Sequence, residues 1–304
     1  MNILLPALGI LIFILLAAGY YFFRVAYYPK VLAVQRTWDL PIEHGHFDPD
    51  EYKSWDREAV TIASQFGYTL YGEYYPLPGS NKTVVLSHGI TNSIYGQVKY
   101  MPIFRRLGYN LLAYDHRFHG RSGGSSCTFG FYEKHDLKAV VDYAFTRLPA
   151  GGKVGTQGES LGAGITLQHA AMDHRIAFAI PDCPYSDLQA LFALRGRLDY
   201  HIPPFPLLNL SNLFSRILLG FTTHDVSPLR DAASIKAPVL LIHGLDDTYI
   251  PPSMSQDIFA ALPPGLSHLH LVPGAGHAEA LVTDPKGYEQ VVTQFLHKVE
   301  STWQ

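Results

Sequence analysis

Residues 153–172 read KVGTQGESLGAGITLQHAAM, and this stretch decides the fold. Its first five residues predict a short strand, and the apolar run that follows the turn predicts a helix. The turn itself is Gly158-Glu159-Ser160-Leu161-Gly162, a G-x-S-x-G sequence. Glycine on both sides permits a tight turn that presents the Ser160 hydroxyl at the helix N-terminus. The strand–turn–helix context therefore indicates a nucleophilic serine, which G-x-S-x-G alone would indicate only weakly. We interpret Glu159 simply as a helix-start residue, favourable at the positive end of the helix dipole.

The chain on both sides of this stretch alternates between short apolar runs and longer helical segments. The runs TVVLSHG and PVLLIHG, separated by helices, predict buried strands of a mostly parallel sheet with helices on both faces. Strands are predicted over Tyr68–Tyr75, Thr83–Ser87, Asn110–Tyr114, Lys153–Gln157, Ile176–Ile180, Pro238–His243 and Leu269–Val272. Helices are predicted near Val98–Leu107, Lys134–Leu148, Leu161–Met172, Ser253–Ala261 and Lys286–Val299.

The interval from about residue 187 to about residue 235 interrupts this alternation. It is rich in Leu, Phe and Pro, and its roughly 50 residues are too many for an ordinary connection between elements. We predict a largely helical cap inserted over one end of the sheet. Additional core helices are the alternative interpretation, and the cluster of Pro203, Pro204 and Pro206 disfavours one continuous helix.

Two further segments follow predicted strands later in the chain. The segment HGLDDTYIP occupies residues 243–251 behind PVLLI, and GAGH occupies residues 274–277 behind HLHLVP. They supply Asp247 and His277, so the order along the chain is Ser160, Asp247, His277. One fold that carries a serine triad uses this order, with each residue just past a strand, whereas two unrelated serine protease folds use other orders.

With these segments in register, the chain resembles the α/β-hydrolase superfamily over roughly residues 66–300. It is particularly similar to bacterial serine hydrolases that have an N-terminal membrane segment and are described as esterase-like or serine-aminopeptidase-like. The resemblance implies a mostly parallel central sheet of about eight strands, with a Ser-acid-His triad at its C-terminal edge. The family pattern H-G-x-x-D-x-x-V-P places the acid at Asp247, with Ile250 in the position of the valine. Asp246 is the second candidate for the acid.

The expected chemistry assigns a role to each of these residues. A serine hydroxyl is a weak nucleophile near neutral pH, so it needs a base, which we assign to His277. Asp247 would orient the imidazole and stabilise its cationic form. The oxyanion needs preorganised donors, of which one is expected to be the N–H of Leu161. The resemblance implies that the other is the N–H of Ile90, in the loop after TVVLS. We interpret His88 in that loop as a support and not as a second base.

Several neighbouring chemistries are disfavoured by residue type. A dehalogenase or an epoxide hydrolase of this fold would carry aspartate at position 160, and a dienelactone-type hydrolase would carry cysteine there. The segment YDHRFHGRSGG at residues 114–124 is similar to the D-x-R-G-H-G-x-S segment of the same fold, but Phe118 stands where glycine is usual. We interpret this loop as structural. Its His116 and His119 do not form an H-E-x-x-H pattern, so we predict no metal and no cofactor.

Residues 3–23, ILLPALGILIFILLAAGYYFF, contain no charged side chain. A helix of that length spans about 31 Å, close to the hydrocarbon thickness, and predicts a single-pass N-terminal membrane anchor. A cleaved signal peptide is the alternative, because Ala17-Ala18-Gly19 offers small residues to a peptidase. However, no basic side chain precedes the run, and the run is longer than the apolar region of a signal peptide. Arg24, Lys30 and Arg36 follow the span, which favours a cytoplasmic catalytic domain.

Composition narrows the class of partner and the organisation of the chain. The 304 residues include 23 basic and 26 acidic side chains, a net charge of −3, so no nucleic-acid partner is predicted. Two cysteines exclude a disulfide framework and a four-cysteine zinc site. The predicted division is an anchor at residues 1–30, a connector at 31–65, and a catalytic domain at 66–304 that contains the cap.

Three functions remain in competition at this point. The first is hydrolysis of a carboxylic ester, including an acylglycerol or a thioester, through an acyl-enzyme on Ser160. Apolar cap residues would wall its acyl pocket, namely Phe192, Phe205, Leu208 and Phe214. The second is an aminopeptidase-like hydrolase, which would need acidic side chains to hold the substrate ammonium, and the acids of the cap are sparse (Asp187, Asp199, Asp225). The third is a non-catalytic, membrane-tethered binding protein.

Overall fold

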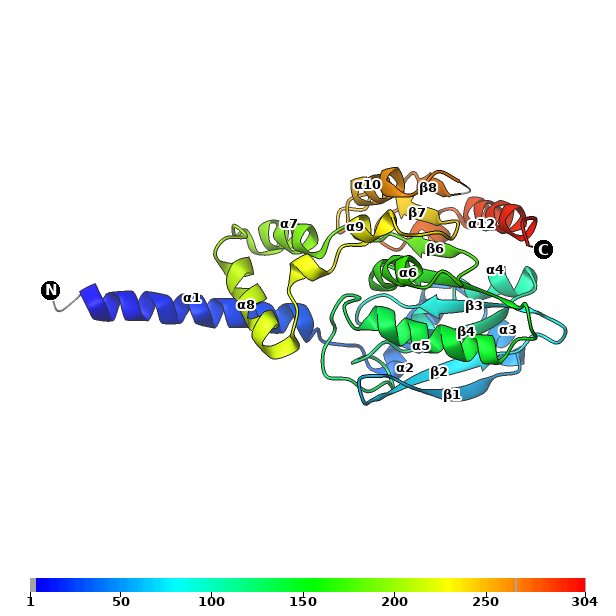
Figure 1. Cartoon of the computed structure of the whole chain (residues 1–304), viewed down its shortest axis with the longest axis horizontal. Helices are drawn as coiled ribbons and strands as arrows, with labels where there is room; N and C mark the ends of the chain where they lie inside the picture. The colour runs from blue at the N-terminus through cyan, green and yellow to red at the C-terminus, as the bar shows by residue number, and fades with distance from the viewer. Residues whose placement is uncertain (1–3, 266, 304) are drawn as a thin grey trace.

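The central feature of the computed structural model is one eight-stranded sheet, in the order β1-β2-β4-β3-β5-β6-β7-β8 (Figure 1). The structure describes residues 4–265 and 267–303. Strands β3 to β8 run parallel to one another, whereas β2 pairs antiparallel with both β1 and β4 at one edge. The strands are β1 (Glu58–Ala63), β2 (Thr69–Tyr75), β3 (Lys82–Ser87), β4 (Asn110–Tyr114), β5 (Lys153–Glu159), β6 (Ala179–Asp182), β7 (Leu240–Gly244) and β8 (His268–Val272). The predicted mostly parallel sheet is confirmed.

Helices cover both faces of this sheet, as the continuous apolar runs of the strands require. Neighbouring residues of one strand point to opposite faces, so Val85 and Leu112 join one apolar cluster while Val84 and Leu111 join another. The helices are α1 (Leu4–Tyr27), α2 (Val34–Glu43), α3 (Pro49–Ser54), α4 (Met101–Arg106), α5 (Glu133–Thr146), α6 (Leu161–Met172), α7 (Leu188–Tyr200), α8 (Leu207–Leu219), α9 (Pro228–Ala232), α10 (Ser253–Ala261), α11 (Ala280–Thr283) and α12 (Pro285–Glu300). Helices α5 and α6 pack on the first face, and α4 and α12 on the second.

Two strands differ most from the sequence prediction. The segment EAVTIA, which lies in the predicted connector, forms β1, whose Val60 and Ile62 alternate with more exposed residues and pack into the core. Strand β6 begins three residues later than predicted. A turn in which the Ile176 amide donates to the Asp173 carbonyl occupies the start of the predicted segment. Both differences lie away from the strand ends that carry the candidate site.

The interval between β6 and β7 forms two separate regions. Helices α7 and α8 stand away from the sheet beside α1 (Figure 1), and the segment with the three prolines separates them. Helix α9, at the end of the interval, instead packs against α6 through Ala232 and the following Ile235. We use the word cap below for residues 188–219, which comprise α7, α8 and the turn between them.

Helix α1 is long and apolar enough to cross a membrane. Figure 1 shows its N-terminal half projecting from the body of the protein, while its C-terminal half lies against α8. Gly19, Phe23 and Tyr27 are buried and recur every four residues, so they form one packed face of the helix. A Cβ on Gly19 would overlap the Cβ of Leu210, which explains the close approach of α1 to α8. The first residue of the predicted span, Ile3, lies outside the described residues.

Candidate active site

The turn that carries Ser160 joins β5 to α6. Ser160 has φ 53° and ψ −110°, a backbone conformation that is strained for a residue with a side chain and is typical of a nucleophile held on a sharp turn. The flanking glycines are required by close approach of the backbone. A Cβ on Gly158 would overlap the carbonyl of Gly162, and a Cβ on Gly162 would overlap the carbonyl of Ser87. The Ser160 amide donates to the Asp182 carbonyl at 2.8 Å, which ties the turn to β6.

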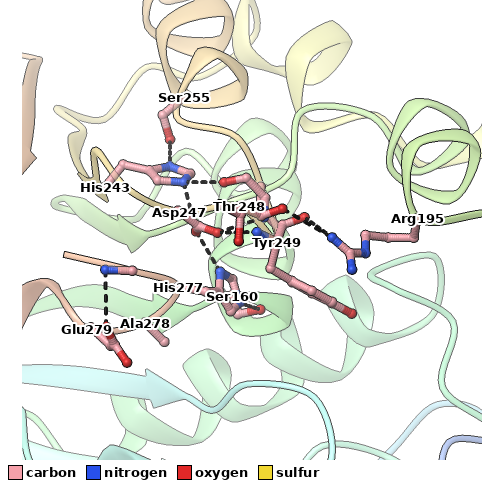
Figure 2. A network of polar contacts seen from close by, with 12 residues as sticks. Ser160, Arg195, His243, Asp247, Thr248, Tyr249, Ser255, His277, Ala278 and Glu279 are labelled. Atoms are coloured by element: carbon pink, nitrogen blue, oxygen red, sulfur yellow. Dashed lines mark hydrogen bonds and ion pairs between the residues drawn. The ribbon is translucent and has the colours of Figure 1, made fainter. Parts of the chain in front are cut away.

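Three side chains from three different turns meet at this point (Figure 2). His277, which follows β8, has its Nε2 atom 2.9 Å from Ser160 Oγ. Its Nδ1 atom lies 2.7 Å from Oδ2 of Asp247, which follows β7. With Nδ1–H donating to the carboxylate, Nε2 is the atom left to accept the serine proton. The three residues that the sequence analysis selected as nucleophile, base and acid are therefore brought into one hydrogen-bonded chain.

The carboxylate of Asp247 is held from several sides. Its Oδ1 atom accepts the backbone N–H groups of Tyr249 and Ile250, each at 2.8 Å. Burial raises the pKa of Asp247, but hydrogen bonds from His243 and His277 outweigh burial and hold this pKa below the usual aspartate range. Asp246 is exposed, and its backbone amide donates to the Ala275 carbonyl. The geometry therefore selects Asp247 as the acid partner of the imidazole.

His243 is a neighbour of the site to which the sequence analysis assigned no role. Its ring is fully buried, with Nε2 2.8 Å from the Ile250 carbonyl and 3.2 Å from Asp247 Oδ2. Its Nδ1 atom lies 2.6 Å from Ser255 Oγ. Since Nε2 faces two acceptors, it carries the proton, and Nδ1 accepts from the serine hydroxyl. The signal for this role was present in the sequence, because His243 opens the HGLDD segment that supplies the acid.

Two backbone amides follow residues of the turn region, Leu161 directly after Ser160 and Ile90 directly after Gly89. The N–H of Leu161 belongs to the first turn of α6, where the helix offers no acceptor. Gly89 lies against the turn, since a Cβ there would sit 3.8 Å from Ser160 Cβ. Within the described part of the chain, the amide of the following residue, Ile90, donates no hydrogen bond. These are the two amides that the sequence analysis expected to face an oxyanion.

His88 fastens the loop that contains Ile90, as the sequence analysis expected. Its ring is completely buried, with Nδ1 2.7 Å from the Gly89 carbonyl and Nε2 accepting the His116 amide at 3.0 Å. Burial, followed by the neighbouring rings of His116 and His119, lowers the pKa of His88 well below the usual histidine range. A neutral ring with both nitrogens occupied acts as a structural link between this loop and the segment after β4.

Glu159 has a larger role than a helix-start residue. Its carboxylate lies 2.7 Å from Lys99 Nζ and accepts the Tyr100 hydroxyl at 2.7 Å. The same Lys99 ammonium donates to the Ala278 carbonyl at 2.9 Å. Burial lowers the pKa of Lys99, but the charge of Glu159 outweighs burial and raises this pKa. Lys99 thus bridges the residue before Ser160 to the residue after His277, and no local sequence pattern predicts this contact.

One group of potential metal ligands lies next to the site. Within the described residues, ligand atoms of Cys183, Asp247 and His277 all lie within 4.8 Å of one another. Asp247 and His277 already bond to each other. Burial raises the pKa of the Cys183 thiol well above its usual value, which favours the neutral thiol over the metal-binding thiolate. The donor set therefore does not fit a metal ion, and Cys183 is a buried packing residue beside Asp247 and His277.

An apolar cavity of about 300 Å³ adjoins these residues beneath the cap. Ile90 and Tyr249 line its inner end, and the Tyr249 ring centroid is 5.0 Å from that of His277. Of the four predicted pocket residues, Phe192 and Leu208 line the cavity. The other two point elsewhere, which corrects their assignment. Phe205, in the turn between α7 and α8, is 73% exposed. Phe214 packs its ring 5.3 Å from Tyr20 and 6.3 Å from Phe23, on the α1 side of α8.

Comparisons with known proteins agree with this fold. A family model described as alpha/beta hydrolase fold matches residues 82–193. An uncharacterized protein, YqkD of Bacillus subtilis, is 31% identical over 304 residues, which cover 99% of each chain. The esterase Pf2001 of Pyrococcus furiosus is similar in structure, with a TM-score of 0.67 and 26% identity over 83% of this chain and 95% of that chain. An acylaminoacyl peptidase of Pyrococcus horikoshii shares the fold, with a TM-score of 0.59 and 16% identity over 84% of this chain and 44% of that chain.

Proposed function

This chain belongs to the α/β-hydrolase superfamily, and from that membership we propose that it cleaves carboxylic esters through an acyl-enzyme on Ser160. The observation that carries the proposal is the continuous hydrogen-bonded chain from Ser160 Oγ through His277 to Asp247. A serine placed in this way is activated by the adjacent base, and the acid holds the base in the productive tautomer.

The proposed reaction follows from the position of each atom. His277 Nε2 removes the Ser160 proton as Oγ attacks the ester carbonyl, and the amides of Leu161 and Ile90 donate to the oxyanion. The intermediate collapses, the alcohol leaves with the proton from His277, and the acyl group stays on Oγ. Water then attacks the acyl-enzyme by the same route and releases the acid. Because its pKa lies below the usual range, Asp247 stays ionised throughout and stabilises the imidazolium.

The cavity favours an ester over a peptide with a free ammonium group. An aminopeptidase of this kind would need an uncompensated carboxylate near the scissile bond. Each of the three acids weighed for this role, which lie between β6 and β7, already has a hydrogen-bond or ion-pair partner. Asp199 pairs with Arg195, Asp187 accepts the Ala190 amide at the start of α7, and Asp225 accepts the Thr222 amide. The similarity to an esterase at 26% identity points the same way. A non-catalytic binding protein would have no need of the aligned serine, imidazole and carboxylate.

We also propose that α1 is retained as a membrane anchor. A peptidase cut within Ala17-Ala18-Gly19 would create a charged amino terminus beside α8, inside the packed contact between the two helices. Arg24, Lys30 and Arg36 follow the span and favour an orientation with the catalytic domain on the cytoplasmic side. We expect the full-length chain to stay with membranes after an alkaline carbonate wash. Release into the supernatant would contradict the anchor.

The test of the reaction is turnover of p-nitrophenyl esters from acetate to palmitate by the full-length chain. We expect Ser160→Ala to lower kcat by about 10⁴-fold or more while leaving the thermal midpoint close to that of wild type. Ser301→Ala, which removes a hydroxyl at the exposed end of α12, is the matched control and should behave like wild type. Undiminished turnover by Ser160→Ala would overturn the proposal. Turnover of aminoacyl amides but of no ester would move the chain to the peptidase class.

A further inference from the structure

The cavity beside the candidate active site has one wall that the cap does not supply. Phe22, Val25 and Ala26 of α1, with Pro29 just after it, line the cavity together with Phe192 and Leu208 of the cap. We propose that α1 is part of the substrate site, so that the acyl chain of a membrane-resident lipid ester binds between α1 and the cap and enters from the bilayer. This inference rests on the proposed esterase function and names its substrate class.

Aromatic packing between α1 and the cap fixes α1 as one side of the cavity. Tyr20 packs edge-on to Phe214 at 5.3 Å between ring centroids, and Phe22 packs edge-on to Tyr200 at 5.0 Å. Phe23 is completely buried within the main apolar cluster. Both helices of the cap therefore pack against α1, and residues of all three helices line the cavity.

The length of α1 determines the position of the cap relative to the bilayer. The candidate span runs from Leu5 to Tyr27. The part before Gly19 has 14 residues, Leu5 to residue 18, or about 21 Å of helix, whereas the hydrocarbon core is about 30 Å thick. A span therefore needs the residues from Gly19 onward, and these are the residues that pack on α8. If α1 crosses the bilayer, α8 lies at the boundary of the hydrocarbon region.

The outer surface of the cap agrees with that depth. Large apolar side chains are exposed on it, including Ile217 at 68%, and Leu198, Phe205, Leu213 and Leu218. Soluble surfaces rarely gather so many exposed apolar side chains on neighbouring helices, and such faces mark contact with a membrane or a partner. Here the exposed face of α8 lies alongside α1, whose own exposed apolar residues would face lipid. The occupant that fits both faces is the bilayer.

The cavity runs from this boundary to the catalytic residues. Val25 and Tyr200 line it and are 40% and 42% exposed, so it reaches the surface between α1 and α7. Its inner end lies at Ile90 and Tyr249, beside the imidazole of His277. An ester carbonyl at Ser160 would thus leave its acyl chain directed along the cavity toward the lipid.

The charge of the lining selects a neutral chain. The Arg195 guanidinium pairs with Asp199, lies 4.4 Å from the Tyr249 ring centroid, and donates to the Thr248 carbonyl at 3.2 Å. Neither charge is left free for a substrate carboxylate or ammonium. At about 30 Å³ for a group the size of a water molecule, a cavity of about 300 Å³ holds a chain of about ten such groups. A medium-length acyl chain matches that volume.

The most direct test of this inference is to place a larger side chain on α1 where the helix lines the cavity. In full-length protein reconstituted in phosphatidylcholine vesicles, we would compare kcat/KM for p-nitrophenyl decanoate and acetate. Ala26→Trp, which fills the cavity, should lower the decanoate-to-acetate ratio at least tenfold, and Ala26→Leu should lower it less. Ala17→Trp makes the same change on an exposed turn of the same helix and should leave the ratio within twofold of wild type.

An unchanged ratio in both Ala26 variants, with hydrolysis that still depends on Ser160, would overturn the inference and leave the esterase function intact. Absence of any Ser160-dependent ester turnover would overturn both. Should Ala26→Trp fail to react with a fluorophosphonate, Ala26→Leu carries the comparison alone.

A separate experiment tests whether the cap contacts the bilayer, as entry of the substrate from the membrane requires. A polarity-sensitive dye on Ile217→Cys should shift to shorter wavelength on reconstitution, whereas the same dye on Asp257→Cys, exposed on α10, should not. Equal behaviour of the two sites would contradict membrane delivery.

Discussion

Two regions of the molecule hold their residues in opposite ways. One is the candidate catalytic edge of the sheet, where Ser160, Asp247 and His277 meet, and the other is the contact between α1 and the cap. At the catalytic edge, buried polar atoms are fixed by directional hydrogen bonds, such as the four that reach the carboxylate of Asp247. At the α1 contact, aromatic rings and one glycine pack without such directional constraint. Directional bonds fix atoms to within tenths of an ångström, as proton transfer needs, whereas apolar packing fixes shape and volume, as binding a chain needs.

The two regions should therefore fail differently when they are damaged. Loss of one polar contact at the catalytic edge should reduce turnover far more than stability. Loss of one ring at the α1 contact should reduce stability and leave the chemistry of a short ester largely unchanged. The following substitutions separate these outcomes, each with a partner that makes the same change where the structure expects little effect.

The largest effect is expected at the acid. Asp247→Asn should lower kcat by on the order of 10³- to 10⁴-fold, because an amide cannot hold the imidazole in the required tautomer. Asp246→Asn, the same change at the exposed neighbour, should stay within a few-fold of wild type. Steady-state hydrolysis of p-nitrophenyl acetate measures both. A larger loss of kcat in Asp246→Asn than in Asp247→Asn would assign the acid to Asp246. It would also contradict the role proposed for the hydrogen-bonded chain from Ser160 to Asp247.

The next effect concerns α1. Phe23 is 0% exposed and Phe13 is 71% exposed on the same helix. Phe23→Ala should lower the free energy of unfolding by about 3–5 kcal/mol, the cost of emptying a packed aromatic site. Phe13→Ala, which faces solvent or lipid, should change the thermal midpoint little. Both midpoints are measured in one detergent, and equal shifts would show that α1 does not pack against the folded domain.

Smaller effects are expected at Lys99, whose substitution should lower both stability and kcat. Lys99→Met leaves Glu159 without its cation and frees the Ala278 carbonyl, so we expect a loss of about 2 kcal/mol in stability and a fall of about tenfold in kcat. Lys138→Met breaks an exposed pair with Asp142 and should cost less than about 1 kcal/mol, with kcat unchanged. A loss of stability with full kcat would make Lys99 purely structural.

The meeting of Ser160, Asp247 and His277 at one edge of the sheet could be predicted from the sequence because the information is local. Each of these three residues lies in the turn after a strand that the sequence predicted, and parallel strands bring those ends to one edge. The prediction of His277 and Asp247 as partners of Ser160 needed only that rule and the order of the segments. His243 was overlooked although it opens the segment that supplies the acid.

Other features could not be predicted because they depend on pairs distant in the chain. Lys99 meets Glu159 and Ala278 across sixty and more residues, with no pattern that marks it. An apolar residue type predicts that Phe214 packs against other apolar groups, but not whether it faces the cavity or α1. In the same way, a continuous apolar run predicts a membrane span and cannot show that one face of it, at Gly19 and Phe23, packs on the protein.

The most direct test of the account is the identity of the nucleophile in the full-length chain. The protein is treated with a fluorophosphonate, digested, and the modified peptide located by mass spectrometry. We expect a single adduct on Ser160, absent in Ser160→Ala and strongly slowed in His277→Gln, because the serine reacts only when the imidazole accepts its proton. An adduct on another residue, or labelling of Ser160→Ala equal to that of wild type, would contradict the assignment of Ser160, His277 and Asp247 as a catalytic triad.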